Sequence, residues 1–196
     1  MGFLFCSVVY FSYLCITKQI NMNFKTIKEV ESHAKQLMNT EYRVEANGKV
    51  HWLTPSRIGY SFKFDNAKRR FGQCSYRRKE ISLSKPLATN NLDNFFQIND
   101  TILHEIAHAL SYKIHGSRGT GHCKRWVHVA KSIGCNGIRC YDSSQVNSIE
   151  HKYTLVCDTC GGKNPRHRRP RRDYSCAKCE PNKFDEKYLL KVVQNF

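Results

Sequence analysis

The chain has 196 residues, of which 40% are hydrophobic and 12% are aromatic, and its formal net charge is +16. This length allows one domain with its own core and a small appended module, and the composition excludes an intrinsically disordered chain. The excess of 32 Lys and Arg over 16 acidic residues favours a polyanionic partner, most simply nucleic acid, although a solvated basic surface gives the same total.

Residues 1–17 carry no charge and are mostly apolar. They lack the basic flank and the cleavage site of a signal peptide, and they are barely long enough to span a membrane. Three interpretations are open: a short membrane anchor, a buried element, or a stretch upstream of the true start at Met22. We favour the third, and we expect residues 1–21 to lie outside the fold. Membrane association would require this segment as its anchor.

The next part of the chain predicts one helix followed by short strands. Thr26 and Glu29 fit a capping box, and apolar residues recur after them at helical spacing. Alternation of apolar and polar residues then predicts strands, at residues 50–53, 58–64 and 81–83. Asn47-Gly48 is typical of a hairpin turn. A small, mainly antiparallel sheet is expected here.

Two more helices follow, and then the composition changes. A helix is predicted from Thr101 to Ile114, capped by Asn99 or Asp100, and another from Lys124 to Ile133. Beyond them, the sequence predicts three further segments: a polar linker at 142–150, a cysteine-paired module at 151–184, and a tail at 185–196.

The predicted helix at 101–114 contains the sequence His104-Glu105-Ile-Ala-His108. Side chains four residues apart lie one above the other on a helix, so both imidazoles can meet one zinc ion. Glu105 points nearby without replacing a ligand, and as a general base it can take a proton from the attacking water. The pattern predicts a zinc peptidase with Glu105 as its catalytic residue.

A catalytic zinc needs a third protein ligand and an open fourth position. Ile114 stands where a metzincin has its third histidine, so that class is excluded. His115 is seven residues beyond His108, a rise of about 10.5 Å along a helix, which is too far for one ion. His122 is favoured because the glycine-rich segment 116–121 can turn the chain back, and His128 remains a rival.

Four of the ten cysteines form two Cys-x-x-Cys pairs, separated by fifteen residues: Cys157, Cys160, Cys176 and Cys179. This spacing is typical of a zinc ribbon, a closed four-thiolate site that is structural rather than catalytic. The sequence therefore predicts two Zn²⁺ ions per chain. Thiolate-bound metal also indicates an intracellular, reducing compartment, the cytoplasm or the nucleus or nucleoid.

Between the cysteine pairs, residues 163–172 are strongly basic and include no acidic residue. Two prolines disfavour a helix, so we expect a basic finger that contacts nucleic acid, DNA being favoured. The predicted contact residues are Lys163, Arg166, Arg168, Arg169, Arg171 and Arg172. A second basic cluster, at 68–70 and 77–79, either extends a phosphate track toward the active helix or protects strand edges.

Several of these motifs together resemble one family. Residues 101–110, Gly121-His122 and Trp126, preceded by 64–74 and 81–84 and followed by 133–141, look like the SprT-like zinc metalloprotease domain, which includes the Spartan-type proteases of DNA–protein crosslink repair. Cys123 departs from the glycine that commonly follows the third histidine.

The resemblance implies an α+β fold over residues 22–141, in which helices pack on a small antiparallel sheet as in a minimal zincin-like metalloprotease, followed by a small zinc ribbon. It also implies that His104, His108 and His122 bind the catalytic zinc, and that protein substrates are bound to DNA. Two other functions stay open: a non-proteolytic nucleic-acid-binding adaptor or regulator, and a general zinc peptidase whose basic surface attracts acidic substrates.

Overall fold

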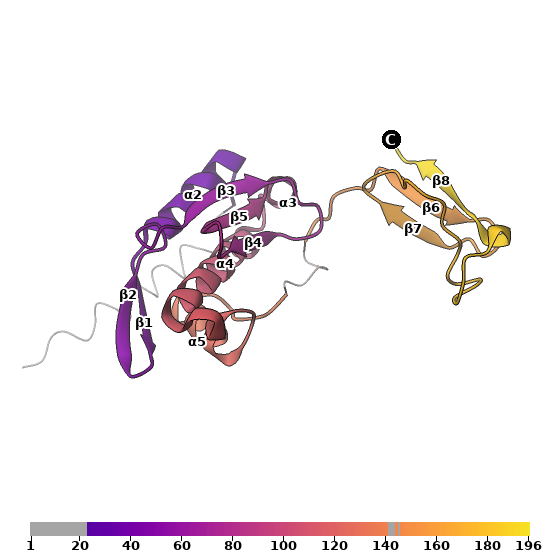
Figure 1. The fold of residues 1–196 in the computed structure, drawn as a ribbon. Coiled ribbons are helices and arrows are strands. Elements are labelled where there is room, and N and C mark those ends of the chain that lie inside the picture. Colours follow the sequence, from indigo (N-terminus) through magenta and orange to yellow (C-terminus); the bar gives the residue numbers. More distant parts are fainter. Residues whose placement is uncertain (1–22, 141–143, 145) are drawn as a thin grey trace, which may run out of the picture. The chain divides into compact units, whose positions relative to one another are not determined.

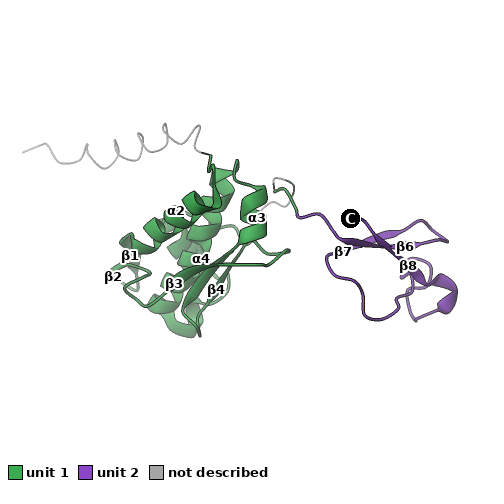
Figure 2. Cartoon of the chain, turned by 90° about the horizontal axis from the view of Figure 1, so that it is seen from above, with its two compact units in different colours: residues 1–148 green, residues 149–196 purple. Residues whose placement is uncertain are grey.

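The computed structural model describes residues 23–140, 144 and 146–196. The chain divides into two compact units, residues 1–148 and 149–196 (Figures 1 and 2). The extension predicted at 1–21 lies outside the described residues. Within the described ranges, no helix combines the length and the apolar character that crossing a membrane requires.

The first described helix, α2 (Ile27–Asn39), begins where its predicted cap places it. The hydroxyl of Thr26 accepts a hydrogen bond from the backbone N–H of Glu29 at 3.3 Å. The Glu29 carboxylate in turn accepts from the N–H of Lys25, one residue before the cap. One face of α2 buries Val30, Ala34 and Met38, which lie four residues apart and therefore on the same side of the helix.

A hairpin follows, made of β1 (Tyr42–Ala46) and β2 (Lys49–Leu53). Asn47 and Gly48 connect the strands at φ values of 54° and 71°, the left-handed conformation that a tight hairpin turn requires. The predicted turn is therefore present. Tyr42 and Val44 of β1 are buried, whereas Trp52 of β2 is 60% exposed.

The central sheet has three strands, β3 (Ser61–Asp65), β4 (Gly72–Ser75) and β5 (Glu80–Ser84), in the order β3-β5-β4 (Figure 1). β4 pairs antiparallel with β5, but β3 pairs parallel with it, so the sheet is mixed rather than mainly antiparallel. β3 also begins later than its apolar alternation predicts, because Ile58 and Gly59 close turns on Thr54 and Ser56.

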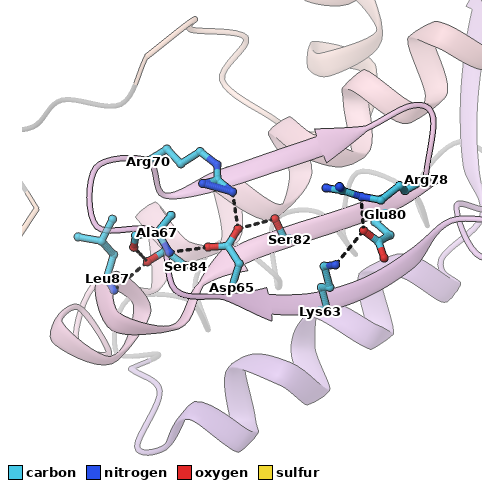
Figure 3. A network of polar contacts seen from close by, with 9 residues as sticks. All are labelled: Lys63, Asp65, Ala67, Arg70, Arg78, Glu80, Ser82, Ser84 and Leu87. Atoms are coloured by element: carbon cyan, nitrogen blue, oxygen red, sulfur yellow. Dashed lines mark hydrogen bonds and ion pairs between the residues drawn. The ribbon is translucent and has the colours of Figure 1, made fainter.

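A polar network joins these strands (Figure 3). Asp65 at the end of β3 accepts hydrogen bonds from Arg70 at 2.7 Å and from Ser82 of β5 at 2.8 Å. Glu80 of β5 pairs with Lys63 and with Arg78, each at 2.8 Å. Arg70 and Arg78, two members of the second basic cluster, therefore form ion pairs with acidic residues of the sheet.

The long helix α4 (Phe95–His115) begins before Thr101, so the predicted start and cap are wrong. Asn94 is the cap, and its side chain accepts from the N–H of Gln97 at 3.1 Å. The side chains of Asn99 and Asp100 instead contact His33 and the N–H of Asn136. α4 packs against α2, α5, β4 and β5, and this burial on several sides explains why apolar residues continue upstream of Thr101.

Shorter elements complete the first unit: α3 (Lys85–Asn90), the 3₁₀ helix η2 (Gly116–Gly119) and α5 (Lys124–Ser132). Gly134 follows α5 with φ 88°, the conformation with which many helices end. α5 packs against α4 and β1, so the segment 116–123 must reverse the chain between two helices in contact.

The second unit is a three-stranded antiparallel sheet of β6 (Tyr153–Cys157), β7 (Lys163–Arg166) and β8 (Leu190–Gln194), with the 3₁₀ helix η4 (Glu186–Tyr188). β6 lies in the middle, so the segment 185–196 supplies a strand and is not a tail. β7 contains the first four residues of the predicted basic finger. Pro165 is accommodated there because β7 is an edge strand.

Because β8 is one of only two partners of β6, we predict that ending the chain at Tyr188 destabilises this unit. Metal should then be extracted from the cysteines by a chelator more readily than from the full chain, since metal binding and folding are coupled in so small a unit. Zinc release monitored with a colorimetric chelator measures the effect. Lys191→Ala is the control, because its ion pair with Asp158 is exposed. Equal release from truncated and full-length chains would contradict the prediction.

Candidate metal centre and active site

α4 presents His104 and His108 on one face, and the ring nitrogens of these residues turn toward a third histidine, His122. The Nε2 atoms of His104 and His122 are 2.9 Å apart, and those of His104 and His108 are 3.3 Å apart. His122 lies between η2 and α5. The structure therefore brings together the three histidines that the sequence favours as ligands.

The chain returns to α4 through a close contact between Gly119 and Ser111. The Ser111 hydroxyl donates to the carbonyl of Gly119 at 2.9 Å. A Cβ atom on Gly119 would lie 2.4 Å from the Ser111 carbonyl oxygen, so only glycine allows this approach. Gly121 then adopts φ 67° and directs His122 toward the α4 histidines.

The donor set fits a zinc ion. Zinc–nitrogen bonds of about 2.0–2.1 Å in a tetrahedron separate the nitrogens by about 3.3 Å, close to the two distances above. Burial lowers the pKa of His104 to about 4 and that of His108 to about 3, with neighbouring imidazoles adding to both shifts. Burial and Arg139 lower the pKa of His122 as well. All three rings are then neutral at neutral pH, the form that binds metal.

Trp126 of α5 forms the floor beneath the three histidines. Its side chain is fully buried, and its ring centroid lies 4.6 Å from those of His104 and His122 and 5.0 Å from that of His108. A rigid ring in contact with all three imidazoles restricts their rotation. No residue spacing in the sequence indicates this role, because α5 meets α4 only after the chain reversal.

The rival residues lie elsewhere. His128 contacts the carbonyl of Glu45 in β1 at 2.6 Å, and His115 contacts the side chain of Asn47 at 3.4 Å. Cys123, beside His122, places its sulfur 3.5 Å from the carbonyl of Arg118. None of the three belongs to the histidine cluster.

Glu105 is buried between α4 and strand β4. A Cβ atom on Gly72 would lie 2.8 Å from the Glu105 carboxylate and from the Thr101 side chain, so a residue without a side chain is required there. Desolvation raises the pKa of Glu105 to about 8, while the backbone of Cys74 and the charge of Arg70 act in the opposite direction. A divalent cation bound at the histidine cluster would act in the same direction as Cys74 and Arg70 and would lower the pKa of Glu105.

These residues line one cleft, with a volume of about 480 Å³. Strand β4 and the turn after it form one wall, and the segment 136–140 forms another. Three arginines lie in the lining, Arg69, Arg70 and Arg139. A cleft that contains Glu105 beside three convergent imidazoles suits metal-assisted hydrolysis.

The four paired cysteines also converge. The sulfurs of Cys157 and Cys179 are 3.8 Å apart and those of Cys160 and Cys176 are 3.6 Å apart. Disulfide bonds are shorter, at about 2.05 Å, whereas four sulfurs about 2.3 Å from a tetrahedral zinc lie about 3.8 Å from one another. The arrangement fits a four-thiolate metal site in a zinc ribbon.

The backbone prepares this site for thiolates. Backbone hydrogen bonds from Cys160 and Thr159 lower the pKa of Cys157 to about 6, and those from Cys179 and Lys178 lower the pKa of Cys176. Desolvation and the three neighbouring sulfurs raise the pKa of Cys179 to about 12. A divalent cation would offset this crowding of like charge.

Comparison with known proteins agrees with the geometry. Among protein-family models, that of the SprT-like family matches residues 34–151. The chain belongs to the SprT-like family. As a SprT-like protein, it has a metalloprotease-type domain, and its histidine cluster and cleft lie within the matched residues. Searches of curated proteins and of solved structures gave no match.

We predict that His122→Ala abolishes tight metal binding at the histidine cluster, because two imidazoles remain where three converge. The loss should exceed the roughly 10–100-fold that follows removal of an outer-shell partner. His115→Ala and His128→Ala are matched controls and should bind as the unaltered chain does. Isothermal titration with Zn²⁺, after the cysteine site is filled, measures the affinity. Weaker binding by a control than by His122→Ala would contradict the ligand assignment.

Proposed function

We propose that this SprT-like protein is a zinc-dependent endopeptidase that acts on proteins bound to nucleic acid, DNA being favoured. One observation carries the proposal: three neutral histidines converge beside a buried glutamate in a cleft of about 480 Å³. The family match supports a metalloprotease-type domain. The nucleic-acid part rests on charge and on the second unit.

In this proposal the residues of the cleft have separate roles. A zinc ion held by His104, His108 and His122 would activate water and polarise the carbonyl of the scissile peptide. Glu105 takes a proton from the attacking water and returns it to the leaving amine. Gly72 keeps the space into which the Glu105 side chain fits. The Glu105 carboxylate is buried among α4, β4 and Thr101. This burial limits the bulk water that would compete with the attacking water for it.

Nucleic-acid binding is proposed for the basic segment of the ribbon. A hollow of about 460 Å³ there is lined by Arg166, Arg168, Arg169, Pro170, Arg171, Arg172 and Tyr174. The guanidinium groups of Arg166 and Arg172 lie 5.8 Å and 5.1 Å from the centre of the Tyr174 ring. This ring holds two guanidinium groups beside the hollow, where they can bind phosphates bidentately. Lys163, at the start of β7, is exposed and adds a further positive charge to this basic segment.

The cleft carries basic residues of its own. Arg69 and Arg139 line it, and neither belongs to the sheet network that holds Arg70. Their position supports the idea that a phosphate backbone lies near the cleft while a protein is cleaved. A peptidase with acidic substrates would use the same two residues, and the assay below separates these cases.

We predict that Glu105→Gln retains both metal sites and lowers cleavage of a DNA-bound protein by about 10²–10⁴-fold, the usual contribution of general acid–base catalysis. Gel assays with and without DNA, together with a metal count, measure both effects. Glu41→Gln, an exposed glutamate on the same unit, is the control.

Equal cleavage by Glu105→Gln would contradict the catalytic assignment. DNA binding without any cleavage would favour a nucleic-acid-binding adaptor instead. Cleavage that DNA does not stimulate would favour a general peptidase.

For the basic segment, we predict that replacing Arg168, Arg169 and Arg171 with Gln weakens DNA binding and flattens its salt dependence. Each lost contact should reduce the slope of log K against log salt by about 0.7–0.9. Fluorescence anisotropy at several salt concentrations measures this slope.

A variant with equal net charge, in which the exposed Lys28, Lys49 and Lys113 of the first unit become Gln, is the control. The same slope change in both variants would indicate that only total charge matters, and would contradict a site on the ribbon.

A further inference from the structure

Tyr76 lies in the turn between β4 and β5, outside the segment that carries the histidine motif. Its hydroxyl oxygen is 3.3 Å from Nδ1 of His108. The Nε2 atom of the same imidazole faces the other two histidines. The tyrosine therefore meets His108 on the side of the ring that points away from the metal position.

A neutral imidazole carries one proton, on either Nδ1 or Nε2. If Nε2 of His108 binds metal, that proton is on Nδ1, and Nδ1 donates to the Tyr76 oxygen. Outer-shell hydrogen bonds of this kind fix the tautomer and the orientation of a ligand histidine. His104 has a counterpart in the backbone of Ile138, which acts to raise the pKa of that imidazole and which no side-chain replacement removes.

Tyr76 also contacts the loop that carries the third histidine. The backbone of Gly121, the residue directly before His122, lies near this hydroxyl and acts to lower its pKa, which burial raises. Gly121 lies on the far side of the chain reversal from α4. One phenol oxygen thus connects a histidine on the long helix with the segment that presents His122.

The ring of Tyr76 is held in place from its other side. It stacks on Tyr112 of α4, with centroids 4.7 Å apart and an angle of 28° between the planes. Its ring is nearly perpendicular to that of His108, with centroids 6.4 Å apart. Stacking fixes the ring plane and helps to keep the hydroxyl at Nδ1 of His108.

We propose that Tyr76 is a positioning residue of the metal centre, which orients His108 and fixes the loop carrying His122. The inference rests on the proposed function, because it assumes that the histidine cluster binds metal. Tyr76 is not assigned a catalytic role, since its hydroxyl meets Nδ1 of His108, the ring nitrogen that faces away from the other two histidines.

The test compares Tyr76→Phe with Tyr112→Phe, so that each variant loses one hydroxyl from the same stacked pair. The probes are Zn²⁺, titrated in competition with a chelator, and Co²⁺, whose visible spectrum reports ligand geometry. In Tyr76→Phe we expect the Zn²⁺ dissociation constant of the histidine cluster to rise about 10–100-fold and the Co²⁺ spectrum of that cluster to change. In Tyr112→Phe we expect neither effect.

Two further measurements separate positioning from general stability. The four-cysteine site of the same chain should keep its affinity, and the thermal midpoint of the metal-free first unit should stay within a few degrees of the unaltered value. Unchanged Zn²⁺ affinity and Co²⁺ spectrum in Tyr76→Phe would overturn the inference while the proposed function stands. Failure of the unaltered histidine cluster to bind Zn²⁺ would overturn both.

Discussion

The candidate active site depends on the contact at which Gly119 reaches Ser111. A helix supplies only two histidines one turn apart, and a third ligand must come from elsewhere in the chain. The reversal after α4 has few residues in which to turn, and the Ser111 hydroxyl and the Gly119 carbonyl meet at 2.9 Å. A side chain at 119 would strike the carbonyl of Ser111. This close approach brings the chain back toward α4 three residues before His122.

Burial then determines the chemistry of the groups that the reversal brings together. Three imidazoles lie above the Trp126 ring, and their pKa values are lowered chiefly by desolvation. The same loss of water raises the pKa of Glu105. A buried carboxyl group and several neutral histidines are costly without a partner. A divalent cation held by the three histidines would compensate both, because it would accept the imidazole lone pairs and attract the carboxylate. The protein environment therefore favours metal over proton at this site.

The sequence predicted the parts of the site that depend on local spacing. His104, His108 and Glu105 follow from helical periodicity, and the cysteine pairs follow from zinc-ribbon spacing. It could not predict the roles of Gly72, Tyr76 or Trp126, because each depends on an element that packs against α4 from a distant part of the chain. The parallel pairing of β3 with β5 was missed for the same reason, since strands of five residues carry no signal of their neighbour's direction.

Errors at element ends have a second cause. Asn99 and Asp100 are good capping residues, but tertiary contacts use both side chains, and Asn94 caps α4 instead. Local propensity indicates which residues could cap a helix, and tertiary packing decides which of them does so. The same holds at the chain end. The sequence predicts a tail at 185–196, but residues 190–194 pair with β6, whose backbone needs a second partner.

The basic residues behind the net charge of +16 fall into groups with different roles. Arg70 and Arg78 neutralise Asp65 and Glu80 within the sheet, so they contribute to the fold and little to an external field. The ribbon arginines surround one hollow that has no acidic residue in its lining. A field from such a cluster is screened within about 8–10 Å at physiological salt. It therefore acts on a polyanion close to the ribbon, and a contact there would have to be direct.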